Sequence, residues 1–172
     1  MVNGNHSELN MISQSRKARI FLDNPESIDG GIIIFRGLIV RRLSRVLRLR
    51  RGDLLEVIYN DQLYEVRLIR IQQDLAEAEI VYSRAIVLNS PPYVTLCPSV
   101  IRLQRFEMVI EKATELGVER IRPVRAIRSL AKNQSGERLA RWRRIVTEAS
   151  EQWRREKRPA IEEPMDFGTL IT

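Results

Sequence analysis

The side chains with the clearest chemical potential in this sequence are arginines that recur without interleaved acids. Seven fall between Arg36 and Arg51, and Arg41, Arg45 and Arg48 have the spacing of one side of a helix. A guanidinium offers a planar fork of donors that fits phosphate and stacks on bases. Such a face neutralises phosphates of a nucleic acid; the alternative is a solubilising surface. Because no acid is interleaved, we favour nucleic acid.

A second basic segment lies between Arg120 and Arg158, where thirteen basic residues face four acids. The whole chain of 172 residues carries a net charge of only +7, so the remainder is acidic. A coding bias would explain why arginine outnumbers lysine, but it would not explain this clustering. Concentrated positive charge raises the local potential toward a polyanion.

Cysteine, histidine and paired carboxylates offer weaker candidates for chemistry. The single Cys97 falls in a predicted strand, and the single His6 falls in a polar tail, so we expect a buried structural thiol, no disulfide and no zinc site. Glu111 and Glu115 share a helical face and could act as acid and base. With Lys112 beside them, a solvated helix face is the favoured interpretation.

Cellular location follows from what the sequence lacks. No apolar run approaches the length of a membrane span, and no signal peptide is recognised. The use of one cysteine fits a reducing compartment. We therefore expect a cytoplasmic protein with no membrane partner and no metal.

The elements that must position the first arginine cluster are predicted to form a small β-barrel over residues 16–88, after a disordered tail at 1–15. Apolar or alternating runs predict strands at 18–22, 32–35, 54–59, 63–71 and 76–82. Between the second and third strands, apolar residues at helical spacing predict an amphipathic helix from Leu38 to Leu49 with an arginine face. A small barrel of this kind, and not a helix-turn-helix, favours RNA over duplex DNA. Tandem prolines place a linker at 89–92.

The second arginine cluster belongs to a region with a different pattern, residues 93–172. Strands are predicted at 93–97 and 118–124, with helices at 103–116 and 137–155. The second helix carries an apolar stripe at Leu139, Trp142, Val146, Ala149 and Trp153, and arginines on its outer face at 141, 143, 144, 154 and 155. Strand–helix–strand–helix is the start of a parallel sheet covered by helices, so the fold class is a two-domain α+β chain.

Several runs of residues agree in order and spacing with one known family. They include Arg45-Val46-Leu47-Arg48 followed by Gly52-Asp53, the run Lys112–Val118 (KATELGV) and Pro123. Further matches are Arg128-Ser129, Glu137-Arg138, Arg141-Trp142, Glu148-Ala149, Glu151-Gln152 and Arg158–Ile161. From about Arg19 onward the chain resembles the small-subunit ribosomal RNA methyltransferase E family, whose members methylate N3 of a uridine in 16S rRNA.

The resemblance implies an architecture and partners. It implies a PUA-like N-terminal barrel that grips RNA, and a SPOUT domain, an α/β fold with a deep trefoil knot that binds S-adenosylmethionine. It also implies a homodimer that acts on 16S rRNA or the 30S subunit. For site residues it suggests RNA contacts at Arg19, Arg45 and Arg48, with Arg41 and Arg42 beside them, and active-site support from Glu115, Arg128 and Gln152.

The chain also departs from the family pattern. Arg42 stands where histidine is usual, and Trp153-Arg154 where a small residue is usual. The family's G-P-E-G-G loop and L-R-x-E-T-A segment, which form the knot and cofactor pocket, do not occur in these residues. We therefore expect a truncated form with no cofactor-binding residues, unable to methylate RNA alone because the methyl donor is not positioned. We also expect an exposed apolar sheet face.

Three interpretations follow from the sequence. The first is a methyltransferase seen as a truncated form, and the second is a non-enzymatic module that binds ribosomal RNA. The third is a structural protein of ribosome assembly. The first two both predict binding to RNA that weakens steeply with salt. Cosedimentation with 30S particles irrespective of the methyl donor would favour the third.

Overall fold

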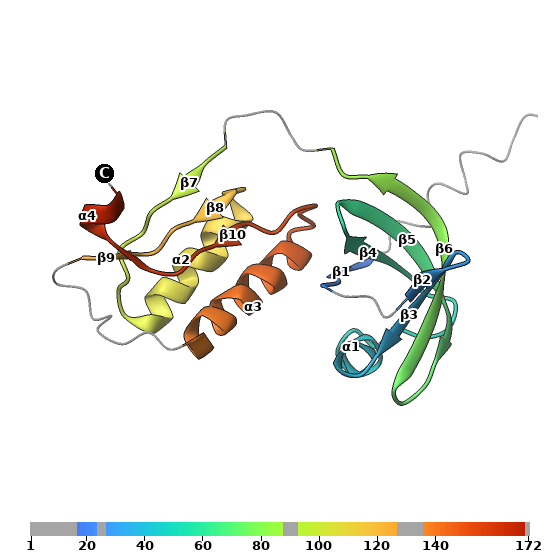
Figure 1. Ribbon diagram of the computed structural model, residues 1–172. Helices are drawn as coiled ribbons and strands as arrows, with labels where there is room; N and C mark the ends of the chain where they lie inside the picture. Colours follow the sequence, from blue (N-terminus) through green and yellow to red (C-terminus); the bar gives the residue numbers. More distant parts are fainter. Residues whose placement is uncertain (1–16, 24–26, 88–92, 127–135, 171–172) are drawn as a thin grey trace, which may run out of the picture. The chain divides into compact units, whose positions relative to one another are not determined.

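The computed structural model describes residues 17–23, 27–87, 93–126 and 136–170. They divide into two compact units, Met1–Ile86 and Val87–Thr172, which are taken separately below (Figure 1). The predicted tail at 1–15 and linker at 89–92 lie outside the described residues. None of the described helices is long and apolar enough to cross a membrane.

The first unit is built on one six-stranded sheet with the order β1-β4-β5-β6-β3-β2. Its strands are β1 (Ala18–Phe21), β2 (Ser27–Asp29), β3 (Ile32–Arg36), β4 (Leu54–Tyr59), β5 (Gln62–Ile71) and β6 (Leu75–Ala85). Every pair is antiparallel except β1 with β4. Five of these strands were predicted from apolar or alternating runs; β2 was not.

Two tight turns fix the register of the antiparallel pairs. Asn60 and Asp61 join β4 to β5 with φ of 46° and 54°, and Gly30 and Gly31 join β2 to β3 with φ of 57° and 81°. Two successive residues at positive φ are the signature of a type I′ hairpin, whose twist matches that of the strands. The end strands β1 and β2 are not paired with each other in the described residues, so the sheet is not closed by hydrogen bonds there.

The main core of the first unit lies on one side of this sheet, and a separate smaller cluster is formed by Phe21, Ile58, Leu63 and Ile86. Its largest member is Phe35, which is 2% exposed, and branched aliphatic residues of β1, β3, β4 and β5 surround it. Ala76 and Ala78 of β6 are fully buried, and their small side chains leave room for Val40 and Leu43. These two residues belong to the helical segment that follows β3. This apolar face anchors the arginine segment to the sheet.

The arginine segment differs from the predicted helix. It forms one turn of α-helix, α1 (Leu38–Arg41), which widens into a π-helical turn, η1 (Arg42–Val46). The wider turn is visible in the bond from Leu47 N to Arg42 O, 2.9 Å. The prediction of one regular helix to Leu49 is therefore wrong.

The second unit is a small parallel sheet with its helices on one face. The strands β7 (Thr95–Leu96), β8 (Arg120–Ile121) and β10 (Ala160–Ile161) pair in the order β10-β8-β7. Beyond Pro123, β9 (Val124–Arg125) pairs in parallel with β11 (Met165–Asp166), so the predicted strand at 118–124 is two short strands. The helices are α2 (Leu103–Glu115), α3 (Gly136–Gln152) and the single turn α4 (Phe167–Leu170).

Successive side chains along the short strands alternate between a buried face and an exposed face of the sheet. Ile121 and Ile161 share one core with Phe106 and Ile110 of α2 and Trp142 of α3, so α2 and α3 cover the same face. Both helices lie there because two successive parallel crossovers of the same hand place them so (Figure 1).

The opposite face of these strands is polar. It carries Arg120 and Arg122, both within 3.2 Å of the carboxylate of Glu162, and the exposed Cys97 follows β7. The expectation of an exposed apolar face is therefore wrong for these strands. The predicted burial of Cys97 is wrong too, because the residue falls in the outward phase of the strand.

The end of α3 corrects two further expectations. The helix ends at Gln152, so Trp153 leaves the apolar stripe and is 58% exposed. Arg155 turns inward instead of outward and donates from Nη1 to Thr114 O at 2.8 Å and from Nη2 to Glu119 at 3.3 Å. Burial lowers the pKa of Arg155 from its ordinary value. This side chain ties the segment after α3 to the end of α2.

Candidate functional site

The topology of the second unit brings two helix N-termini to one edge of its sheet. Because β7, β8 and β10 are parallel, α2 and α3 each run back against the strands and begin at the strands' carboxyl edge. Ligands of open α/β sheets bind at this edge, where helix N-termini present free N–H groups and a positive dipole end. The edge is therefore the first place to look for a site.

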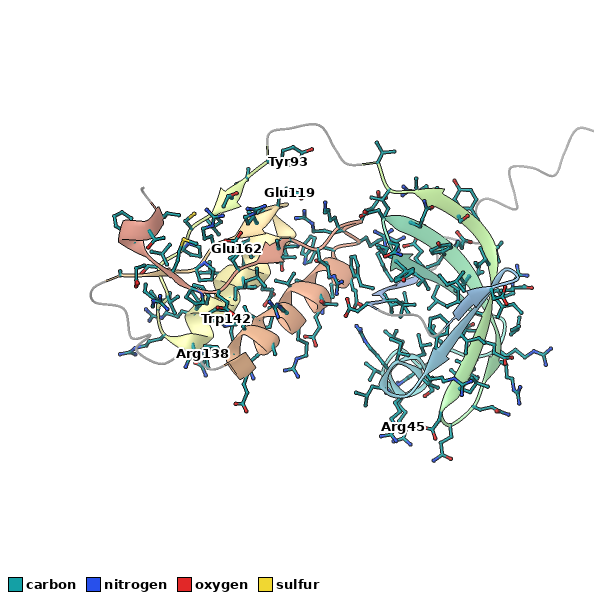
Figure 2. All side chains as sticks on the ribbon, in the orientation of Figure 1. Arg45, Tyr93, Glu119, Arg138, Trp142 and Glu162 are labelled. Carbon is teal, nitrogen blue, oxygen red and sulfur yellow. The ribbon has the colours of Figure 1, made fainter. Side chains whose placement is uncertain are left out.

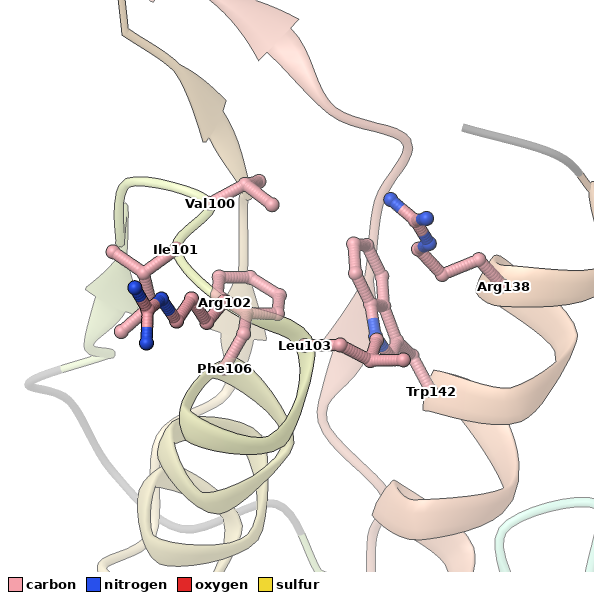
Figure 3. A pocket seen from close by; sticks show the side chains of 7 residues that line it. All are labelled: Val100, Ile101, Arg102, Leu103, Phe106, Arg138 and Trp142. Atoms are coloured by element: carbon pink, nitrogen blue, oxygen red, sulfur yellow. The ribbon is translucent and has the colours of Figure 1, made fainter. Parts of the chain in front are cut away.

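A pocket of about 260 Å³ lies at this edge, between the first turns of α2 and α3. Figure 3 shows its lining, which combines apolar walls with two arginines and consists of Val100, Ile101, Arg102, Leu103, Phe106, Arg138 and Trp142. The rings of Phe106 and Trp142 pack with centroids 4.7 Å apart and are fully buried. The walls are thus part of the core, which makes the pocket a built feature of the unit.

The charge around the pocket is positive. Arg102 precedes α2, whose first turn has no acid and no side-chain cap. Arg138 lies in the first turn of α3, and in the described part of the chain neither arginine makes an ion pair or side-chain hydrogen bond. Figure 3 shows Arg138 beside the indole of Trp142 and Arg102 at the opposite rim. Glu137, also in the first turn of α3, is exposed and is not part of the lining.

An ion pair next to the pocket holds the two helices together. Arg141 of α3 donates from Nε and Nη2 to the carboxylate of Glu107 in α2, at 2.5 and 2.9 Å. These hydrogen bonds hold the pKa of Glu107 below its ordinary range. Arg141 is therefore committed to a structural contact, unlike Arg102 and Arg138.

The indole of Trp142 adds an unsatisfied donor to the wall. Its Nε1 is buried and has no hydrogen-bond partner. Figure 3 shows this nitrogen on the side of Leu103, which is 44% exposed. A buried donor without an acceptor costs about 1–3 kcal/mol, so native proteins rarely keep one without a reason.

The predicted RNA-contacting arginines of the first unit lie in α1, η1 and the residues after them. Arg41 and Arg45 are exposed, Arg42 is half-buried, and Arg48 is exposed with φ of 54°. Figure 2 shows Arg45 pointing away from the sheet. No carboxylate pairs with Arg41, Arg45 or Arg48 within the described ranges. This exposed group remains a predicted phosphate-binding surface.

Arg19, the other predicted RNA contact, has a different environment. Its side chain is 6% exposed, and both Nε and Nη2 lie 2.7 Å from Oε2 of Glu56. A direct contact with phosphate would require this side chain to leave its carboxylate. The geometry favours a role in holding β1 against β4, the strand that carries Glu56.

Two of the predicted active-site residues, Glu115 and Gln152, are not brought to the pocket. Glu115 and Gln152 end α2 and α3, at the edge of the sheet opposite the pocket. Glu115 accepts from Lys112 Nζ at 2.7 Å, and Glu111 accepts from the same ammonium at 3.3 Å, which raises the pKa of Lys112. Arg128 lies outside the described residues.

Comparison with known proteins gives the chain its relatives. Residues 89–172 match the family model described as RNA methyltransferase domain. Ribosomal RNA small subunit methyltransferase E of Synechocystis is 32% identical over 148 residues, or 86% of this chain and 48% of that protein. The protein of the same name from Aquifex aeolicus is 31% identical, over 83% of this chain and 62% of its own length.

Solved structures agree. The crystal structure of ribosomal RNA small subunit methyltransferase E from Neisseria gonorrhoeae, bound to S-adenosyl methionine, superposes with a TM-score of 0.79 and 30% identity, over 90% of this chain and 64% of that one. The chain belongs to the ribosomal RNA small subunit methyltransferase E family. A Legionella pneumophila methyltransferase at 22% identity, also with a TM-score of 0.79, shows the same fold. The chain spans about half to two thirds of the length of these methyltransferase E relatives.

The pocket at the two helix N-termini was missed by sequence reasoning. Arg138 was predicted only as part of a family match, Trp142 as part of a family match and of an apolar helix stripe, and Arg102 was not singled out. The available signal was the pair of basic residues at the starts of two helices that each follow a parallel strand. That signal becomes specific only when the order of the strands is known.

Proposed function

We propose that this protein acts as the methyltransferase of its family, transferring a methyl group from S-adenosylmethionine to N3 of a uridine in 16S rRNA. The observation that carries the proposal is the similarity, over nine tenths of the chain, to a methyltransferase E bound to S-adenosyl methionine. Methylation replaces the N3 proton with a methyl group and so releases one proton. S-adenosylmethionine supplies the methyl group when bound.

The pocket described above does not fit this cofactor. At about 260 Å³ it is below the range of about 300–1,000 Å³ that drug-sized ligands occupy. Its polar lining is cationic and contains no carboxylate to accept from ribose hydroxyls. No step of the reaction is assigned to this pocket through the cofactor.

The two units suit a division of labour in this function. We propose that the first unit is a PUA-like barrel that binds RNA through Arg41, Arg45 and Arg48, with Arg42 beside them and Arg19 supporting the sheet. The second unit, with its parallel strands, is proposed to belong to a SPOUT (trefoil-knot) domain that dimerises and carries Glu115, Arg128 and Gln152 as active-site support. The partners are then 16S rRNA or the 30S subunit in the cytoplasm.

Methyl incorporation tests the proposed activity. The purified protein is incubated with unmodified 30S subunits and S-adenosylmethionine carrying a labelled methyl group, and the product uridine is identified by mass spectrometry of nuclease digests. Label at N3 of a single 16S uridine supports the proposal and overturns the expectation that these 172 residues alone do not methylate RNA. Binding to 30S subunits without label would instead favour the non-enzymatic module, since both readings predict RNA binding.

The arginine surface is tested separately by RNA affinity. Replacing Arg41 and Arg45 together with alanine is expected to weaken binding about tenfold or more and to reduce its salt dependence. Arg67→Ala is the matched control, because Arg67 is half-exposed but already paired with Glu79 at 3.0 Å. Equal losses in the two variants would contradict the proposed surface.

A further inference from the structure

We propose that the pocket between the first turns of α2 and α3 is a phosphate subsite for the RNA strand, a function that the family's cofactor and the N-terminal barrel do not supply. The inference rests on the proposed function, since it takes RNA to be the substrate. It assigns Arg138 and Arg102 to one backbone phosphate and the indole N–H of Trp142 to one of its oxygens.

The charge at the pocket favours an anion. Two helix N-termini meet at the pocket, and each favours an anion through its free N–H groups and its dipole. Arg138 and Arg102 add two full positive charges that no carboxylate of the described chain neutralises. Their neighbour Arg141 shows the contrast, because it is neutralised by Glu107. The pocket is thus the part of this edge where positive charge is left over.

The wall of the pocket also contains a hydrogen-bond donor without an acceptor. The indole N–H of Trp142 is fully buried in the wall of the pocket and lacks an acceptor. A phosphate presents several strong acceptor oxygens, and a guanidinium fork holds it in a fixed orientation. Figure 3 shows the guanidinium of Arg138 at the end of the indole away from its nitrogen, and Leu103 beside that nitrogen. A phosphate oxygen that reaches the N–H must therefore displace the half-exposed Leu103 side chain.

The size and position of the pocket favour a phosphate of an RNA strand. The pocket takes a phosphate with part of its sugar but is too small for a whole dinucleotide. A carboxylate has the same charge chemistry, so the carboxylate of the methyl donor is the competing source of the anion. The open position at the sheet edge, with exposed residues around the rim, suits a chain that continues on both sides, as an RNA strand does.

The test uses the whole protein and a short oligouridylate as the probe. Arg138→Ala is expected to weaken binding about tenfold, and Arg102→Ala somewhat less because this residue lies at the rim. Each should lower the magnitude of the salt slope by about 0.7, the value for one phosphate contact on a single strand. Arg143→Ala is the matched control, since Arg143 is an exposed arginine of α3 that does not line the pocket. A similar loss in this control would overturn the site.

The donor is tested by Trp142→Phe, which keeps an aromatic ring but removes the pyrrole ring together with its N–H. Because Trp142 is fully buried, the variant should melt at a lower temperature than the parent; its RNA affinity, measured well below that transition, should fall severalfold. In a Trp153→Phe background, Trp142 is the only tryptophan, so its fluorescence should shift when oligouridylate binds and should not shift in the Arg138→Ala variant. Unchanged affinity and fluorescence would remove the indole from the site.

Two outcomes separate this inference from the proposed activity and from the competing anion. Loss of S-adenosylmethionine affinity in Arg138→Ala, with oligouridylate affinity unchanged, would assign the pocket to the donor carboxylate and overturn the RNA subsite. Absence of methyl incorporation in the parent protein, together with the pocket-specific loss of oligouridylate binding, would overturn the activity and leave the subsite standing.

Discussion

The two units of this protein achieve a folded core by opposite means. In the first, strands of up to eleven residues form a six-stranded ladder, and the sheet supplies most of its own core. In the second, every strand has only two residues, and the core depends on α2 and α3 packing over them. The first unit is therefore held by a sheet and the second by a helix pair.

The use of arginine differs in the same way. The second unit commits many of its arginines to carboxylates, as with Arg122 and Glu162 or Arg141 and Glu107. The first unit leaves Arg41, Arg45 and Arg48 without such partners, within the described residues. Each unit has arginines at a helix with no ion pair among the described residues: Arg41 and Arg45 on α1 and η1 in the first, and Arg102 and Arg138 at the starts of α2 and α3 in the second. The arginines without a carboxylate partner, and not the total charge, indicate where an anion could bind.

The largest expected effect comes from removing one buried ring in each unit. Phe35→Ala in the first unit and Phe106→Ala in the second should each lower the free energy of unfolding of their own unit by about 3–5 kcal/mol. Both tryptophans lie in the second unit, so tryptophan fluorescence reports its unfolding, while hydrogen exchange of β4 and β5 peptides reports the first. If either variant destabilised both units equally, the comparison of two separate cores would fail.

The next effect concerns the buried ion pair of the first unit. Arg19→Ala leaves Glu56 in β4 with its side chain 12% exposed and its main cation gone, which should cost about 3 kcal/mol. Replacing both residues with leucine should recover most of that loss, because no buried charge remains. Urea unfolding followed by hydrogen exchange of β1 and β4 provides the measurement. An Arg19→Ala variant of parental stability but poor RNA affinity would instead show Arg19 to be a direct contact.

Much of the secondary structure could be predicted because pattern and packing agreed. The bounds of β4 were predicted residue for residue, since an apolar run ends there at a turn pair that tolerates positive φ. The apolar stripe of α3 was confirmed at Leu139, Trp142, Val146 and Ala149. The strands β10 and β11 could not be predicted, because each has two residues, which are too few to show any period.

The candidate site was harder to predict than the elements. Apolar spacing around Val46 suggested a continuing helix, but the π-helical turn changes the phase and leaves Val46 70% exposed. Arg155 looked like a surface residue until the end of α3 turned it inward. The pocket combines Arg102 with Arg138, and only the parallel order of the strands brings them to one edge. Local sequence carries no record of that order.

A smaller effect is expected at low pH from the open face of the second sheet. Hydrogen bonds and charge from Arg122 lower the pKa of Glu162, so its ionised form stabilises the folded state above the ordinary carboxyl pKa of about 4.3. That stability is lost as the pH falls through the depressed pKa in the folded state. Glu162→Gln should lower Tm by about 2 °C at neutral pH, and the difference from the parent should vanish in acid. A constant difference at every pH would show that the carboxylate charge is not the cause.

The smallest effect should come from an ion pair of similar geometry in a wetter place. Arg125 donates to Asp166 at 3.0 and 3.4 Å, in the same two-pronged manner that Arg122 uses with Glu162. The side chains of Arg125 and Asp166 are 41% and 69% exposed, however, and water competes for both charges. Asp166→Asn should therefore leave the unfolding midpoint of the second unit unchanged within error, although the pKa of Asp166 is also lowered by its arginine. A loss as large as that of Glu162→Gln would mean that solvent exposure does not determine how much each arginine–carboxylate pair of this unit contributes to stability. Pairing alone would then not show which arginines are available to bind an anion.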